Sequence, residues 1–351
     1  MALLEAASFN WDCVSVFDPV KTSVLLLLML VLLVMLSVGT SSLAHPERSQ
    51  TPAKERTGLF KIPVWMGNAT AGFQTDLKAE DFHVVEGNVP LELSKFLKPE
   101  SPTLLFIAFD TVGEIANINQ ARAALNEELE KLSSQYWVGL ISAQEQITVA
   151  QDPTPDRKLL REKIEGFTQI GKAGLLESIQ SVADFTSGIL LKADVRVAVI
   201  FVTDSDIGNY RADYLNPPVN ASDSRDLSRR FGGRALQEKI SRMAPALAKF
   251  QAPIFIVHID PGRDPLNRAY QNGLKQFAQA VGGQLFLSKT VGDIPTVIQE
   301  VFQWVRSFYV LGFEAPRVKS GFLKVQVSLS HEPGSSSISG HLIYPSRLFF
   351  P

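Results

Sequence analysis

Three apolar stretches of this chain each end on an aspartate. Residues 103–109, 195–203 and 253–259 are dominated by aliphatic and aromatic side chains, and Asp110, Asp204 and Asp260 follow them directly. Apolar runs of this length between helical segments are typical of buried parallel strands. In open α/β sheets, ligands bind at the edge formed by the carboxyl ends of the strands. The pattern therefore predicts carboxylates at a binding edge.

Two further acids stand close to the first two aspartates. Glu114 follows Asp110 after three residues, and Asp206 follows Asp204 after one. Carboxylate oxygens are ligands for Mg²⁺ and Ca²⁺, and four carboxylates around one ion are more typical of Ca²⁺ than of Mg²⁺. A divalent cation bound by Asp110, Glu114 and Asp204 is one interpretation, and solvated acids at a sheet edge without an ion are the other.

The elements that position these acids alternate between strand and helix. This alternation predicts an α/β fold with a doubly wound, mostly parallel sheet of the Rossmann-like type over residues 99–307. Strands are expected at 103–110, 136–141, 146–150, 195–204, 253–260 and 284–288, and helices at 115–133, 156–164, 172–191, 234–250, 264–280 and 290–306.

Strand-like segments flank this region on both sides. Residues 59–98 predict a small β unit, with Trp65 and Phe82 in its core, and residues 308–351 predict further strands. Residues 321–329 alternate strictly between apolar and polar side chains, which is the period of a half-buried strand. A small meander is not stable alone, so we expect the two segments to pack together into one β unit built from both ends of the chain.

The N-terminal region indicates export. Residues 23–38 are almost wholly aliphatic, and Ser42-Leu43-Ala44 has the small-x-small form of a cleavage site. The run is short for a spanning helix, which needs ~20 residues, yet the acidic leading segment is unusual for a signal peptide. Residues 1–44 are therefore predicted to be either a signal peptide or a membrane anchor. Residues 45–58 are a polar linker, and the folded part is expected in the periplasm, outside the cell or tethered to the membrane.

The composition excludes several functions. The net charge is −2 without a long basic run, so nucleic acid is not an expected partner. The single cysteine excludes a disulfide framework, and five scattered histidines show no zinc-binding spacing. His258, within an apolar strand, is expected to be a hydrogen-bonded core residue. There is no nucleophile-and-base motif, so we predict a non-enzymatic protein. A hydrolase at the acidic edge is the minor alternative.

These features together resemble a von Willebrand factor A domain. The likeness covers roughly residues 60–351. The segments 76–88 (DLKAEDFHVVEGN), 308–313 (FYVLGF) and 321–327 (GFLKVQV) look like the flanks of the VWFA-related proteins of Acidobacteria. In family members that bind a metal ion, the first strand ends in Asp-x-Ser-x-Ser, a second loop adds a threonine and a third adds an aspartate. The resemblance implies the A-domain fold and a role in adhesion or protein binding.

This sequence departs from the metal-binding pattern of that family. Asp110 and Asp204 match the two aspartates, but the serine positions hold Val112 and Glu114. The threonine position falls near residues 171–174, which contain Lys172 and no hydroxyl. The resemblance thus implies a degenerate metal-ion-dependent adhesion site, with Lys172 as a candidate neutralising group. The alternative is a Mg²⁺- or Ca²⁺-dependent module with Glu114 as a substitute ligand.

We therefore expect an exported or membrane-anchored module for protein–protein interaction or adhesion at the cell envelope. Binding is expected at the loops of the carboxyl edge, around 110–114, 171–174 and 204–232. The candidate residues of this edge are Asp110, Glu114, Lys172, Asp204 and Asp206. The partner would be a protein, with a membrane contact through residues 23–38 if that segment is retained.

Overall fold

The computed structural model describes residues 57–68, 72–144, 147–168, 174–190, 193–206, 238–243, 247, 250–316, 322–330 and 341–349. The chain divides into two compact units, Met1–Lys54 and Glu55–Pro351, and all of the described residues belong to the second. The predicted signal or anchor segment and its linker lie outside the described residues, as do Lys172 and most of the long loop after Asp206.

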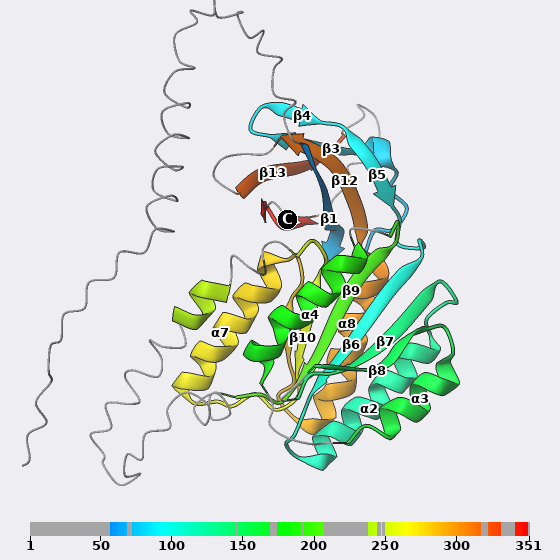
Figure 1. Ribbon diagram of the computed structural model, residues 1–351, viewed down its shortest axis with the longest axis vertical. Helices are drawn as coiled ribbons and strands as arrows, with labels where there is room; N and C mark the ends of the chain where they lie inside the picture. Colours follow the sequence, from blue (N-terminus) through cyan, green and yellow to red (C-terminus); the bar gives the residue numbers. More distant parts are fainter. Residues whose placement is uncertain are drawn as a thin grey trace, which may run out of the picture. The chain divides into compact units, whose positions relative to one another are not determined.

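A six-stranded sheet forms the centre of the second unit (Figure 1). The strand order is β11-β10-β9-β6-β7-β8. Neighbouring strands are parallel except β7 and β8, which run antiparallel, so the sheet is mixed. The strands are β6 (Thr103–Asp110), β7 (Tyr136–Ser142), β8 (Thr148–Thr154), β9 (Arg196–Thr203), β10 (Ile254–His258) and β11 (Leu285–Leu287).

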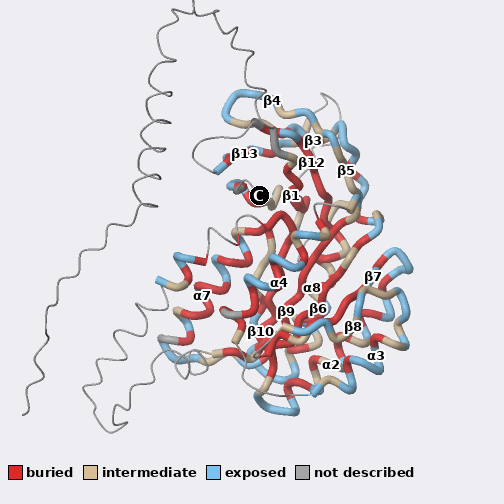
Figure 2. Tube along the Cα trace, in the orientation of Figure 1, coloured by how far each residue is buried: buried red, intermediate tan, exposed pale blue. Residues whose placement is uncertain are grey.

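Apolar side chains cover both faces of this sheet. In β6, Leu105, Ile107 and Phe109 join one buried cluster, whereas Phe106 and Ala108 join another. This split follows from the two-residue period of a strand. The first cluster includes residues of α2 (Ile115–Glu130), α3 (Arg157–Glu165) and α8 (Ile294–Ser307), and the second includes residues of α4 (Leu175–Leu190) and α7 (Pro265–Ala280). Figure 2 shows the strands as the most continuously buried part of the fold.

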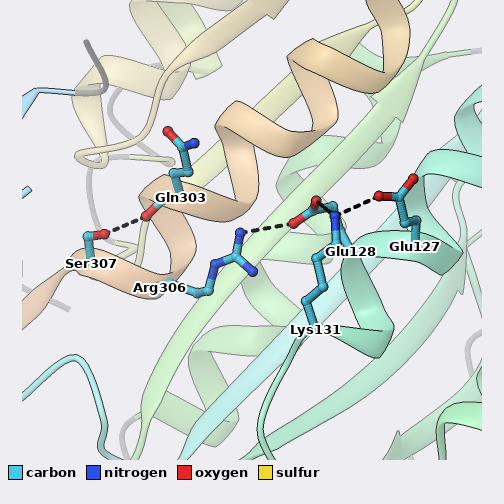
Figure 3. A network of polar contacts seen from close by, with 6 residues as sticks. All are labelled: Glu127, Glu128, Lys131, Gln303, Arg306 and Ser307. Carbon is cyan, nitrogen blue, oxygen red and sulfur yellow. Dashed lines mark hydrogen bonds and ion pairs between the residues drawn. The ribbon is translucent and has the colours of Figure 1, made fainter. Parts of the chain in front are cut away.

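A buried ion-pair network joins α2 to α8 (Figure 3). The Glu128 side chain of α2 is only 4% exposed, and its two oxygens contact Lys131 Nζ at 2.8 Å and Arg306 Nη2 at 2.9 Å. Lys131 also pairs with the exposed Glu127 at 2.7 Å. A buried carboxylate is costly without a partner, so Glu128 fixes the two helices against each other through Arg306.

Strands from the two ends of the described chain pair with each other. β1 (Thr57–Asn68) is antiparallel to β12 (Tyr309–Pro316), within a sheet that also contains β2 (Gly72–Phe73), β5 (Leu93–Leu97) and β14 (Leu342–Ile343). A four-stranded sheet follows the order β15-β13-β3-β4. Its strands are β3 (Phe82–Glu86), β4 (Val89–Leu91), β13 (Phe322–Leu329) and β15 (Arg347–Phe349). Phe60, Phe82 and Leu323 belong to the buried cluster that the two sheets share.

Two buried basic side chains, Lys61 and Arg196, connect these strands with the central domain through hydrogen bonds. Lys61 of β1 donates from Nζ to the carbonyl oxygens of Leu190, the last residue of α4, and Ala193, just after it, at 2.9 and 2.8 Å. Arg196, at the start of β9, donates from Nη1 to Phe308 O at 3.0 Å, at the end of α8. Helix C-termini leave carbonyl groups unpaired and carry partial negative charge, so both cations stabilise a helix end.

Trp65 and Phe82, predicted as core residues of the small β unit, are both buried. Trp65, however, packs with the α8 cluster of the central domain, and its Nε1 donates to Trp304 O at 2.9 Å. Its aromatic neighbours, Phe255, Trp304 and Phe308, lie in β10, in α8 and directly after α8, so the prediction that Trp65 belongs to the core of the small β unit is wrong. Among the described residues, no helix combines the length and apolarity that crossing a membrane requires.

Candidate functional site

The candidate site lies where β6 and β9 end side by side. Asp110, the last residue of β6, is paired in register with Thr203, the last residue of β9. The backbone N–H of Asp204 donates to Asp110 O at 3.3 Å. The parallel register thus places the carboxyl groups of Asp110 and Asp204 at the same edge of the sheet, although 93 residues separate Asp110 from Thr203 in the chain.

Asp110 is fully buried and bonded at both carboxyl oxygens. Oδ1 accepts the backbone N–H of Gly174 at 2.7 Å, and Oδ2 accepts the hydroxyl of Thr203 at 2.8 Å. The Thr203 hydroxyl is itself held by the backbone N–H of Ser205 at 2.9 Å. Burial raises the pKa of Asp110 to about 8, against the lowering effect of these two hydrogen bonds. Asp110 is therefore mostly protonated and neutral at pH 7.

Asp204 is held by the loop that follows β6. Its Oδ1 and Oδ2 accept the N–H of Val112 at 3.1 and 3.0 Å, and Oδ2 also accepts the N–H of Gly113 at 2.6 Å. Burial raises the pKa of Asp204, and these backbone hydrogen bonds oppose the increase. A side chain at position 113 would bring its Cβ to 2.8 Å from Oδ2. Glycine therefore permits the close approach of loop and carboxylate.

Val112 and Glu114 are the two residues compared above with the serines of metal-binding A domains. Val112 contributes a backbone N–H to Asp204 and no side-chain oxygen. Glu114 is exposed and precedes α2 as its N-cap residue, without a hydrogen bond from its side chain to the helix. Gln144, from the loop after β7, fixes the residue before Val112 by donating to the carbonyl oxygen of Thr111.

The remaining predicted residues take different positions. Asp206 is partly buried, and Lys172 lies outside the described residues. Within the described part of the chain, no three acidic, histidine or cysteine side chains are grouped closely enough to hold a metal ion. The structure therefore brings Asp110 and Asp204 together, but it does not add Glu114 or Asp206 to a common set of ligands.

Whether these residues can bind a divalent cation depends on the oxygen atoms that they offer as ligands. Mg²⁺ needs an octahedral shell of oxygen ligands. Asp110 has no exposed surface and both of its oxygens accept hydrogen bonds, and the loop facing Asp204 presents N–H groups, which repel a cation. The described donor set therefore does not fit a Mg²⁺ site, and a Ca²⁺ site would need still more oxygen ligands.

His258 links the neighbouring strand to this edge. It is 1% exposed, and its Nε2 lies 2.8 Å from Ser205 O. The prediction of a hydrogen-bonded core histidine is confirmed. Burial lowers the pKa of His258, which favours its neutral form. The Ser205 hydroxyl contacts the Tyr270 hydroxyl of α7 at 2.9 Å, so this polar chain anchors the start of the long loop.

A cavity that no sequence pattern predicted lies beside this site. It is lined by Glu114 and Asn117 of the α2 start and by loop residues that follow β10 and β11. The three segments are far apart in the chain, so no sequence motif could connect them. The only available signal was that all three follow strands or begin a helix at the same edge.

Comparisons with known proteins give low similarities throughout. No protein-family model and no curated protein matches the sequence. The similar solved structures include a von Willebrand factor type A protein from Catenulispora acidiphila, with 12% identity over 78% of this chain and 75% of that one and a TM-score of 0.39.

Two other similar structures share about a tenth of their residues with this chain. They are the PilB minor pilin from Streptococcus sanguinis, at 10% identity over 59% of this chain with a TM-score of 0.42, and proximal thread matrix protein 1 from the mussel byssus, at 10% over 59% with a TM-score of 0.38. The chain covers 61% of the pilin and 48% of the mussel protein, less than two thirds of either. At such scores, the description of the fold rests on the strand order and register of the chain itself.

Proposed function

We propose that this chain is an exported interaction module of the von Willebrand factor A type that binds a protein partner without a metal ion and without catalysis. The resemblance of the sequence suggests the A-type, doubly wound architecture. The acidic edge at the ends of β6 and β9 supports the choice of binding surface, because ligands of open α/β sheets bind at this edge.

One observation carries the ion-independent part of the proposal. Asp110 and Asp204 are the only two predicted ligands that keep the family's residue type, and both are bonded to donors of the protein itself. The Val112 and Gly113 N–H groups occupy the side of Asp204 that faces the loop. The partner would thus contact exposed side chains of the surrounding loops rather than a bound ion.

The same proposal includes the layout of the chain. Residues 1–44 would direct export or anchor the protein, and residues 45–58 would act as a tether. Residues 99–307 would form the A-type domain, and residues 59–98 and 308–351 would form the β unit beside it. The pairing of β1 with β12 and of β3 with β13 supports this last part.

Capture of a partner from cell-envelope extract tests the proposal. The chain is immobilised and the extract is applied with excess Mg²⁺ and Ca²⁺ or with EDTA. We expect the same partner in equal amount under both conditions. A partner that is captured only with divalent ions would contradict ion-independence and favour Glu114 as a substitute ligand.

A pair of matched variants tests the position of the surface. Glu114→Lys changes the exposed edge residue, and Glu165→Lys makes the same change at an exposed position of α3, away from the site. We expect capture to fall at least about tenfold in the first variant and to stay within twofold in the second. Equal capture by both would place binding elsewhere on the molecule.

A further inference from the structure

A cavity of about 270 Å³ opens at the carboxyl ends of β10 and β11, next to the candidate site. Its charged lining comes from four residues, Glu114, Asp260, Arg263 and Lys289. All four are exposed, and none of them makes an ion pair within the part of the chain that the structure describes. The cavity therefore offers two positive and two negative groups that are free to pair with a ligand.

Contacts of the chain group these four residues into two pairs of like charge. Arg263 donates from Nη2 to Lys289 O at 3.1 Å, so the two cationic residues are neighbours; we call them the basic side. Glu114 follows Gly113, which donates to Asp204, and Asp260 also interacts electrostatically with Asp204. Glu114 and Asp260 thus lie toward the candidate site, and we call them the acidic side.

A buried acceptor lies next to the acidic side. Asn117, one turn after Glu114 in α2, lines the cavity and is only 7% exposed. Its Oδ1 has no hydrogen-bond partner among the described residues. A buried carbonyl oxygen without a donor costs about 1–3 kcal/mol. A ligand that brings an N–H donor to this position would remove that cost.

Apolar surface completes the cavity. Ile259, Pro261 and Val291 contribute the smaller, apolar part of a mostly polar lining, and Val291 is 43% exposed. A ligand with a small hydrocarbon group could bury part of this surface, and each buried CH₂ is worth about 0.8 kcal/mol.

We propose that this cavity binds a free aliphatic α-amino acid as a zwitterion. Its ammonium group would pair with the acidic side and donate to Asn117 Oδ1, and its carboxylate would accept from the basic side. Its side chain would contact the apolar lining. An ion of a single charge would leave one side of the cavity unpaired, and a neutral ligand would leave both. This inference does not depend on the proposed protein partner or on metal independence.

Three ligands that share one side chain test the charge requirement. Leucine, N-acetylleucine and leucinamide are titrated into the full chain at pH 7.5, and heat is measured by calorimetry. The acetyl group removes the positive charge, and the amide removes the negative one. We expect leucine to bind with a dissociation constant of about 1 mM or tighter, and each blocked form to bind at least about tenfold more weakly.

The outcomes separate the zwitterion site from its rivals. Absence of leucine binding at about 10 mM would overturn the proposal. Equal binding of leucine and N-acetylleucine would show a simple anion site at the basic side, and equal binding of leucine and leucinamide would show a cation site at the acidic side. Either result would also overturn it.

Variants locate the ligand in the cavity. Lys289→Met and Asp260→Asn each remove one exposed charge, so the fold is expected to persist, which the melting temperature checks. Each should weaken leucine binding at least about tenfold. The matched controls, Lys275→Met on α7 and Asp184→Asn on α4, change exposed residues outside the lining and should leave it within twofold. Unchanged binding in both cavity variants would overturn the assignment.

Discussion

The two ends of the central sheet bury acidic and basic side chains, respectively, and satisfy them in the same way. At the carboxyl end, Asp110 and Asp204 accept hydrogen bonds mainly from backbone N–H groups. At the amino end, Lys61 and Arg196 donate to backbone carbonyl groups at the ends of α4 and α8. No acidic side chain forms an ion pair with either cation, and no basic one with either acid, among the described residues.

The amino end of the sheet suggests an explanation for Asp110 and Asp204 that needs no metal ion. Taken alone, a pair of buried aspartates at a sheet edge suggests a missing cation. The opposite edge shows that this fold also places charged side chains where backbone groups of one polarity gather, without any ion. Asp110 and Asp204 therefore have the same structural explanation as Lys61 and Arg196. Four substitutions test whether the two edges are stabilised in the same way.

Removing the cation at the amino end should have the largest effect. Arg196 is fully buried, and besides its two carbonyl partners it donates to the Tyr136 hydroxyl at 2.8 Å and lies over the Phe308 ring. Arg196→Met should lower the free energy of unfolding by about 3 kcal/mol, because the carbonyl groups of α8 lose their donor. Urea denaturation measures this loss.

Arg347→Met, at an exposed position of β15, is the control for this change. It should change the free energy of unfolding by less than ~0.5 kcal/mol. A similarly small effect of Arg196→Met would mean that the buried cation is not needed for the amino end, and the parallel between the edges would fail.

Asp110→Asn should change how stability depends on pH. The pKa of Asp110 is raised to about 8 in the folded chain, above its ordinary value of 3.8. Its contribution to stability is therefore complete below pH ~4 and is lost as the pH rises through about 8. The variant lacks this titration, so at pH 9 it should be more stable than the wild type by at least ~2 kcal/mol. At pH 4 this advantage should disappear.

Unfolding curves of both proteins between pH 4 and 9 measure the difference. Titrations elsewhere in the chain affect both proteins and cancel in the comparison. If the stability difference between the two proteins does not grow with pH, Asp110 is ionised in the folded chain. Some other group would then have to balance its charge.

Gly113→Ala should disturb the contact between the loop and Asp204. The new Cβ would lie 2.8 Å from Asp204 Oδ2, so the carboxylate or the loop must move and weaken the hydrogen bonds between them. We expect a loss of about 1 kcal/mol in the free energy of unfolding, measured by urea denaturation.

Gly188→Ala is the matched control, because a Cβ at this position of α4 meets no atom within 4 Å. Alanine is favoured over glycine within a helix, so this variant should gain about 0.5–1 kcal/mol. Effects of the same sign in the two glycine variants would contradict the role given to Gly113.

Glu114→Gln should have the smallest effect. Glu114 is exposed, and its side chain does not cap α2. Loss of its charge should change the free energy of unfolding by less than ~0.5 kcal/mol, with or without added Mg²⁺, in thermal unfolding. A stabilisation of the wild type by Mg²⁺ that this variant lacks would identify Glu114 as a metal ligand.

Local patterns predicted the elements that position the site. The strand predicted at 103–110 is present as β6, and the helix predicted at 156–164 is present as α3, with Asp156 accepting the N–H of Leu159 at its start. These features depend on neighbouring residues, whose apolar spacing and capping chemistry are visible in the sequence. The meeting of Asp110 and Asp204 also followed, because parallel strands end at one edge.

Other features depend on backbone groups and on distant contacts, which cannot be recognised from residue types in the sequence. The Val112 side chain has no oxygen and indicates the loss of a ligand, but the Val112 backbone N–H donates to Asp204. Arg196 is the first residue of a strand, a position at which a charged side chain is usually expected to be exposed. Its carbonyl partners lie more than a hundred residues away in the chain. The cavity at Asn117 required three distant segments to be brought together.

Calorimetric titration of the chain with Mg²⁺, Ca²⁺ and Mn²⁺ tests whether the carboxyl edge binds a metal ion. It is performed at pH 7.5 and at pH 9, so that protonation of Asp110 cannot hide a metal site. Ion-independent recognition predicts no binding in the micromolar range at either pH. Micromolar binding that is abolished by Asp110→Asn or Asp204→Asn would contradict ion-independent recognition and show that the carboxyl edge is a metal site.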